Sequence, residues 1–132
     1  MPQLVLKRRD FLGITVTGAA ALFWKPLQAK ALGGKLPEIG EPAPKFVLPG
    51  TQGGGLSKDW DLGHWSGRWL VLYFYPRDFT SGCTIEAHGF QEALKDFNAH
   101  QCDIAAVSAD SVDDHESFCS SEGLDFTLLS DP

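Results

Sequence analysis

The fold of this 132-residue chain is decided by one stretch, WLVLYFYP at residues 69–76. It is an unbroken run of apolar and aromatic residues, most of which favour strands, and it ends at a proline that cannot extend a ladder. Such a run is typical of a strand buried on both faces, in a sheet that helices cover on each side. The run therefore predicts an α/β domain.

The sequence after this strand alternates helical and strand patterns. Apolar residues spaced three and four apart predict a helix that begins near Cys83: Ala87, Phe90, Leu94 and Phe97. Residues 103–108 form the next buried strand, and residues 126–129 begin another. Between them we expect a helix capped by Ser111 or Asp113 and ended by Gly123, with His115, Phe118 and Cys119 on one side.

The sequence before the first stretch predicts less regular structure. Residues 46–49 predict a short strand that Pro49 and Gly50 end, and residues 53–55, all glycine, predict a turn. Trp60 and Trp65 are expected to anchor a loop-rich region with their indole N–H groups near the surface. The expected order is strand, strand, helix, strand, helix, strand, and the strand–helix–strand units imply parallel pairing with right-handed crossovers.

The first 31 residues have the features of an export signal. Lys7, Arg8 and Arg9 precede an uncharged stretch, residues 11–24, which is too short to span a bilayer. Residues 29–31 have the small-x-small form of a cleavage site, and residues 8–12 resemble the twin-arginine export motif. We expect residues 1–31 to be removed and residues 32–132 to form one domain. An uncleaved amphipathic anchor is the alternative.

This signal predicts a compartment. The expected location is the periplasm or the thylakoid lumen, without stable membrane insertion, and it is the cytoplasm if the signal is not cleaved.

Composition excludes some classes of function. The chain has 11 Lys and Arg against 17 Asp and Glu, a formal charge of −6, so it lacks the clustered basic charge that nucleic-acid binding needs. Three cysteines cannot form a disulfide framework, and they indicate redox chemistry, a metal site or core filling.

The candidate reactive residues lie within residues 75–87, around Cys83. A cysteine in the first turn of a helix meets unpaired N–H groups and the positive end of the dipole, and both favour thiolate over thiol. Thr80 can place a hydroxyl beside the sulfur of Cys83, and Pro76 stiffens the turn. A buried cysteine that only fills space is the alternative.

The pattern Pro76-x-x-x-Thr80-x-x-Cys83 resembles the signature of the peroxiredoxins. Together with residues 74–87, 107–110 and 128–132, it is similar to the peroxiredoxin Q branch, also called bacterioferritin comigratory protein, over residues 37–132. The resemblance implies a thioredoxin-like fold with a central mixed sheet flanked by helices. It also implies a thiol peroxidase, active in antioxidant defence, that reduces hydrogen peroxide and alkyl hydroperoxides.

The resemblance also implies roles for single residues. Cys83 would be the peroxidatic thiolate and become a sulfenic acid, and its N–H would help bind the peroxide. Thr80 would orient the peroxide and bond to the sulfur, Pro76 would shield the sulfenate, and Glu86 would order the pocket. The implied reductant is thioredoxin or a similar dithiol, and a monomer without metal or cofactor is expected.

Two departures from the family pattern concern activity and recycling. The family pocket uses an arginine from a later strand, and none of Arg8, Arg9, Arg68 and Arg77 has such a place. We expect a C-terminally truncated chain without the final strands and helix, which would leave an exposed sheet edge and could be inactive. His88 stands where many members of the branch have their resolving cysteine.

Cys119 lies in the helix where other members of the branch place the resolving cysteine, so we expect it to close a disulfide with Cys83 after local loosening of both helices. The alternative is that Cys119 is only part of an apolar helix face. Cys102, at the start of a strand, is expected to be a buried structural thiol.

Three other functions stay open. Cys83 with His88, or His115 with Cys119, are metal-ligand spacings, although no four-ligand set is complete. A thiol–disulfide oxidoreductase of the same fold would need a Cys-x-x-Cys pair, which Cys83 lacks. A truncated thioredoxin-like fragment could only bind partners.

Overall fold

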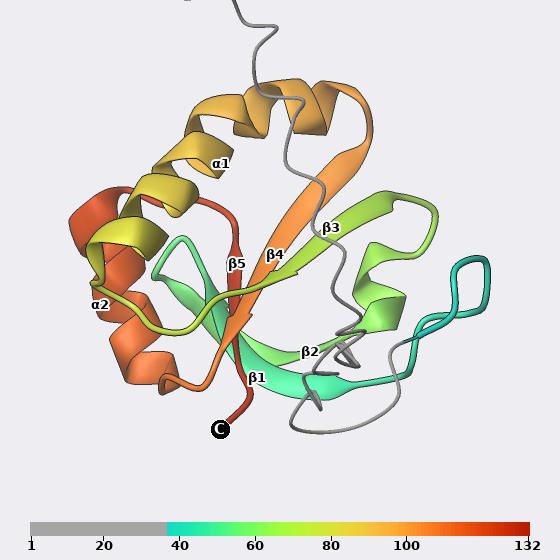
Figure 1. The fold of residues 1–132 in the computed structure, drawn as a ribbon, viewed down its shortest axis with the longest axis horizontal. Coiled ribbons are helices and arrows are strands. Elements are labelled where there is room, and N and C mark those ends of the chain that lie inside the picture. The colour runs from blue at the N-terminus through green and yellow to red at the C-terminus, as the bar shows by residue number, and fades with distance from the viewer. Residues whose placement is uncertain (1–36) are drawn as a thin grey trace, which may run out of the picture. The chain divides into compact units, whose positions relative to one another are not determined.

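The computed structural model describes residues 37–132, so the expected export signal at residues 1–31 lies outside the described residues. Five strands form one mixed sheet in the order β2-β1-β5-β4-β3 (Figure 1). The elements are β1 (Val47–Gln52), β2 (Leu56–Asp61), the 3-10 helix η1 (Leu62–Trp65), β3 (Trp69–Phe74), α1 (Ser81–Ala99), β4 (Cys102–Ser108), α2 (Val112–Glu122) and β5 (Thr127–Ser130). No helix within residues 37–132 has the length and apolar character needed to cross a membrane.

The parallel half of the sheet follows the sequence pattern. β3 pairs with β4 and β4 with β5, both in parallel, and α1 and α2 form the two crossovers. Because both crossovers step the same way along the sheet, both helices lie on one face (Figure 1). Ile104, Ala106 and Leu128 point to that face and pack with residues from both helices.

The prediction that β3 is buried on both faces is wrong for the described part of the chain. β3 is an edge strand, and Trp69 and Phe74 at its ends are 77% and 71% exposed. The other face of the sheet is covered by Trp60 of β2 and Trp65 of the 3-10 helix η1, and no α-helix of the described residues lies on it. The apolar run gave the strand but could not give its place in the sheet, which depends on its neighbours.

The antiparallel half was only partly predicted. β1 does not end at Pro49 and Gly50 but continues to Gln52, because its last three residues, Gly50–Gln52, pair with β5. Pro49 lies outside the pairing with β5, so no strand on that side needs a hydrogen bond from the N–H that proline lacks. Residues 53–55 form the expected turn, and it leads into β2, a strand that the sequence pattern did not predict.

Trp60 and Trp65 do anchor this region, but not with indole groups at the surface. Trp60 lies within β2 and is 1% exposed, and Trp65 is 5% exposed. Their rings stack with centroids 5.8 Å apart on the face opposite the helices. The Nε1 atom of Trp60 is buried and has no hydrogen-bond partner within residues 37–132, so the prediction about its N–H is wrong.

The limits of α2 follow from its caps. Ser111 accepts from the N–H of Asp114 and the Asp114 side chain accepts from the N–H of Ser111, which is a capping box. Gly123 ends the helix in the left-handed conformation, with φ of 66°. Of the two expected caps, Ser111 is therefore the N-cap, and Gly123 is the C-cap as predicted.

Candidate active site

The candidate site lies at the carboxyl edge of the parallel strands. The N–H of Tyr75 donates to the carbonyl of Val107 at 3.0 Å and extends the β3–β4 ladder by one bond. Pro76 has no N–H to extend it further, so the chain leaves the sheet and crosses to α1. The loops after β3 and β4 meet the end of β5 at this edge, where α/β sheets commonly bind ligands.

Cys83 is the third residue of α1, as the sequence predicted, and it is 9% exposed. The N–H groups of the first turn have no carbonyl partner inside a helix, and no side chain caps them here. No acidic residue lies in that turn. The sulfur therefore stands at the positive end of a 19-residue helix whose terminal N–H groups are open to an anionic group.

Thr80 and Pro76 are both exposed in the loop that leads to α1. Thr80 is the N-cap residue in an extended conformation, but its hydroxyl donates to the carbonyl of Arg77 at 3.2 Å. The expected hydrogen bond from Thr80 to the sulfur of Cys83 is therefore not made in this structure. The carbonyl of Arg77 lies three residues back in the turn and competes for the same hydroxyl.

Glu86 lies on α1 three residues after Cys83, and it is exposed. Burial raises the pKa of Tyr73, and the electrostatic influence of the nearby Glu86 and Cys83 raises it further. Tyr73 thus keeps its proton while it packs against the helix that carries both groups. Its ring stacks on Phe90 of the same helix with centroids 4.5 Å apart.

Cys119 is 1% exposed and belongs to the same core cluster as Cys83. Burial raises the pKa of Cys119 to about 11, although the N–H of Gly54 acts in the opposite direction. The turn that contains Gly54 packs directly on α2 at this point. Cys83 and Cys119 are both free thiols here, and Cys119 is a protonated thiol at neutral pH.

Cys102 is half-buried rather than fully buried, which corrects the expectation for this residue in part. It begins β4 at the amino end of the strand, in a recess lined by Trp69, Phe97 and His100. Cys83 follows the opposite end of the parallel sheet, so Cys102 is far from the loop that carries Pro76 and Thr80.

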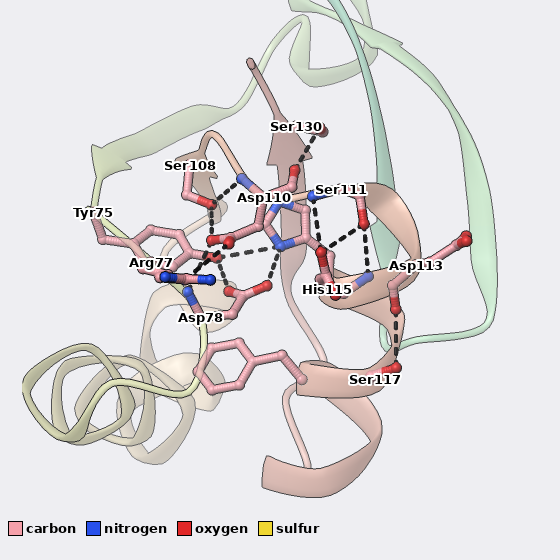
Figure 2. A network of polar contacts seen from close by, with 12 residues as sticks. Tyr75, Arg77, Asp78, Ser108, Asp110, Ser111, Asp113, His115, Ser117 and Ser130 are labelled. Carbon is pink, nitrogen blue, oxygen red and sulfur yellow. Dashed lines mark hydrogen bonds and ion pairs between the residues drawn. The ribbon is translucent and has the colours of Figure 1, made fainter.

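A buried polar network next to the Cys83 loop was missed by the sequence analysis (Figure 2). Asp78 accepts from the hydroxyl of Tyr75 at 2.6 Å and lies 2.7 Å from Nδ1 of His115. Nε2 of His115 lies 3.2 Å from the carbonyl of Leu129. The available signal was a histidine on the apolar side of a helix, which needs polar partners when buried.

Asp110 joins the loops after β3 and β4 to the end of β5 (Figure 2). Its carboxylate accepts from the Asp78 N–H at 2.8 Å and from the Ser108 hydroxyl at 2.6 Å, and its carbonyl accepts from the Ser130 hydroxyl. Burial works to raise the pKa of Asp110, but the hydrogen bonds from Ser108 and from the Asp78 N–H outweigh it together with the electrostatic influence of His115 and Arg77, so the pKa is lowered. Asp110 is therefore an ionised anchor for the loop before Cys83.

Both arginines within residues 37–132 have carboxylate partners. Arg68 makes two hydrogen bonds to Asp103, at 2.6 Å and 2.8 Å, at the amino end of the parallel strands. Nε of Arg77 lies 4.0 Å from Asp110, and its side chain is 77% exposed. Within residues 37–132, the ion pairs of both arginines are thus with carboxylates of β4 or of the loop after it.

The histidines considered as metal ligands are otherwise engaged. Nε2 of His88 lies 3.0 Å from a carboxylate oxygen of Glu122, and His115 has both ring nitrogens within the polar network. Across the described part of the chain, no three His, Cys, Asp or Glu side chains gather as a metal ion requires. The contacts of these histidines are those of structural side chains.

Comparison with known proteins places this site in a family. The model of the AhpC/TSA family matches residues 39–132, which includes every element of the sheet. The chain belongs to the AhpC/TSA family. Its relatives include a peroxiredoxin Bcp of Xanthomonas campestris, 43% identical over 90 residues, and a peroxiredoxin bcp of Coxiella burnetii, 45% identical over 94 residues.

These matches cover 68% and 71% of this chain but 55% and 60% of the two relatives. A solved structure of the Xanthomonas campestris bacterioferritin comigratory protein, described for its alkyl peroxide reduction activity, superimposes with a TM-score of 0.56 at 40% identity. That match covers 64% of this chain and 52% of the solved one. The resemblance to the peroxiredoxin Q branch and the thioredoxin-like mixed sheet are thereby confirmed, and the chain spans about half the length of these relatives.

Proposed function

We propose that this chain is a thiol peroxidase that reduces hydrogen peroxide and alkyl hydroperoxides through Cys83. The observation that carries the proposal is the position of Cys83 at the open first turn of α1, within a domain of the AhpC/TSA family. The alkyl peroxide reduction described for the Xanthomonas campestris relative supports the same substrate class.

The first step is a nucleophilic substitution at oxygen. The Cys83 thiolate attacks one oxygen of the peroxide, an S–O bond forms, and the O–O bond breaks. The leaving hydroxide or alkoxide takes up, through solvent, the proton that the Cys83 thiol released on ionisation, so the products are a sulfenic acid and water or an alcohol. The uncapped N–H groups at the start of α1 are suited to stabilise the negative charge that develops on the peroxide.

The second step in the proposal is resolution by Cys119. Its thiol displaces hydroxide from the Cys83 sulfenic acid, which gives a disulfide and one water, and an external dithiol such as thioredoxin then reduces the disulfide. Two structures of Xanthomonas campestris peroxiredoxin Q carry cysteine-to-serine substitutions, at positions separated by as many residues as Cys83 and Cys119. This equal separation supports the pairing.

Burial sets a condition on this step. Cys119 is a buried thiol whose pKa is raised to about 11, and a protonated thiol is a poor nucleophile. The N–H of Gly54 contacts its sulfur, and Ser57 of β2 hydrogen-bonds Glu116 of α2. Resolution therefore requires α2 to open far enough for Cys119 to meet water and the sulfenic acid.

The test is the intact mass of the reduced chain before and after one equivalent of hydrogen peroxide. Loss of two hydrogens, abolished by Cys83→Ser and by Cys119→Ser, is the expected result. A stable gain of one oxygen on Cys83 in the parent chain would keep the peroxidase and refute Cys119 as its resolving partner. No change in a chain that circular dichroism shows to be folded would refute the peroxidase itself.

Cys102→Ser is the matched control for these variants. It removes the third thiol of the chain, which lies at the opposite end of β4 from the candidate site. Its mass change on oxidation should equal that of the parent chain. If it abolishes the loss of two hydrogens, the disulfide joins a different pair of cysteines.

We also propose that residues 1–31 direct export before the domain acts. The support is the sequence pattern alone, with Arg8 and Arg9 ahead of the apolar stretch. Expression of the full chain in a bacterium with and without a working twin-arginine pathway tests this. Processing that persists without the pathway would refute that route.

A further inference from the structure

Asp78 and His115 form a deeply buried pair of ionisable side chains that the proposed chemistry does not use. Their side chains are 2% and 0% exposed, and 2.7 Å separates Oδ2 of Asp78 from Nδ1 of His115. Asp78 belongs to the loop between β3 and α1, whereas His115 belongs to α2. The pair therefore joins the loop that leads to Cys83 to the helix that carries Cys119.

The hydrogen-bond partners fix where the protons stand. The carbonyl of Leu129 can only accept, so Nε2 of His115 carries a hydrogen and donates it. Nδ1 of His115 and Oδ2 of Asp78 form the second hydrogen bond of the ring, while Oδ1 accepts from the Tyr75 hydroxyl. Every polar atom of this buried group then has a partner. Such a satisfied network holds its members in one geometry.

A second contact runs beside the first. The ring of Phe79 meets the ring of Phe118 edge-to-face, with centroids 5.1 Å apart. Phe79 has a φ of 59°, a left-handed conformation that a residue of this kind holds only when its surroundings impose it. His115 and Phe118 are three residues apart on α2, so one face of that helix contacts the adjacent loop residues Asp78 and Phe79. Figure 2 shows the first of these contacts, between His115 and Asp78.

We propose that His115 is a positioning residue for Cys83, which holds the loop at residues 75–80 through Asp78 and so sets the start of α1. The inference rests on the proposed function for its catalytic consequence. The contacts of His115 and Phe118 also couple the position of Cys83 to the packing of the helix that carries Cys119. Cys119 follows His115 by four residues and Phe118 by one, so opening α2 to free Cys119 separates both contacts from the loop. The loop before Cys83 therefore loses these two contacts when the disulfide forms. It regains them only when α2 packs against the loop again.

Two substitutions at one position separate the two bonds of the imidazole. His115→Asn keeps a donor close to the place of Nδ1, beside Asp78, and loses the bond to Leu129. His115→Gln keeps a donor near the place of Nε2 and loses the bond to Asp78. Both remove the ring, so a purely structural role predicts similar behaviour for the two variants.

The first readout is the rate at which Cys83 is oxidised by hydrogen peroxide. We expect His115→Gln to lower this rate roughly tenfold or more and His115→Asn to stay within about threefold of the parent, as small misplacements of reacting groups have large effects. Ser117→Ala is the control, because its hydroxyl bonds only the carbonyl of Asp113 in its own helix. Equal rates for the two His115 variants would overturn the proposal.

The second readout, alkylation of Cys83 by iodoacetamide, does not depend on peroxidase activity. A parent chain that peroxide leaves unchanged refutes the proposed function, and the alkylation rates of the two variants then still decide the positioning role. If His115→Gln does not fold, His115→Leu replaces it. This variant fills the buried position with an apolar side chain but removes the bond to Asp78, and an unchanged Cys83 rate in it would overturn the proposal.

Discussion

Gly54→Ala perturbs the contact between the β1–β2 turn and α2, and its cost can be worked out from the structure. Gly54 has a φ of 69°, where an alanine costs about 1–2 kcal/mol. An added Cβ would lie 2.7 Å from Oγ of Ser120, 3.0 Å from the carbonyl of Glu116 and 3.3 Å from Cβ of Cys119. Overpacking of this kind costs about 1–3 kcal/mol more. We expect a total loss of about 2–5 kcal/mol in the free energy of unfolding.

The two neighbouring glycines are matched controls. Gly53 has a φ of 59°, but its added Cβ would meet only the Cα of Asp125 at 4.0 Å, so Gly53→Ala should show the backbone cost alone, about 1–2 kcal/mol. An added Cβ at Gly55 meets nothing within 4 Å and needs no positive φ. Gly55→Ala should therefore leave stability unchanged or raise it by up to about 1 kcal/mol.

The assay is urea unfolding of the reduced chains in the presence of excess reductant, and circular dichroism monitors the transition. Gly54→Ala should also make Cys119 react faster with iodoacetamide, because the strained turn pushes α2 away from the sheet. If Gly53→Ala and Gly54→Ala cost the same within about 0.5 kcal/mol, the turn does not press on α2 and this reasoning is refuted.

Three further predictions concern titration, packing and capping. Since burial raises the pKa of Cys119 from 9.0 to about 11, the folded state binds this proton more tightly than the unfolded state, so stability should fall as the pH rises from 9.0 towards 11. Cys119→Ala should lack that part of the decrease in urea unfolding at each pH, and an identical pH profile would contradict the raised pKa. Leu128→Ala empties a fully buried position and should cost about 2–5 kcal/mol by the same unfolding measurement, and a cost below about 1 kcal/mol would show a loose core. Ser111→Ala removes the capping box of α2 and should cost about 1 kcal/mol, which Ser111→Asp should largely restore.

Local signals predicted the helices well. The caps of α2 lie within a few residues of the positions they serve, and the spacing of Ala87 and Phe90 fixes the buried face of α1. The strand β2 was missed because only Trp60 of its six residues is buried, so its pattern does not alternate clearly. The edge position of β3 was missed because an apolar run does not show which strands lie beside it.

The candidate site likewise has a part that the sequence predicted and a part that it did not. Cys83, Thr80 and Pro76 are close in sequence, so their spacing was enough to predict a cysteine at the start of a helix. The partners of that loop are far away in sequence: His115 follows Asp78 by 37 residues and Asp110 follows it by 32. No pattern along the chain relates them.

The sequence by itself determined that a strand, a turn and a helix present Cys83 at an open helix end, because those preferences act over a few residues. Only the tertiary structure decided what holds that turn in place and what covers Cys119. Two parallel crossovers bring the carboxyl ends of β3, β4 and β5 together, and there Asp78 meets His115 and Asp110. Burial of Cys119 beneath Gly54 arises from the same assembly, since burial depends on residues that are distant in the chain and adjacent only after folding.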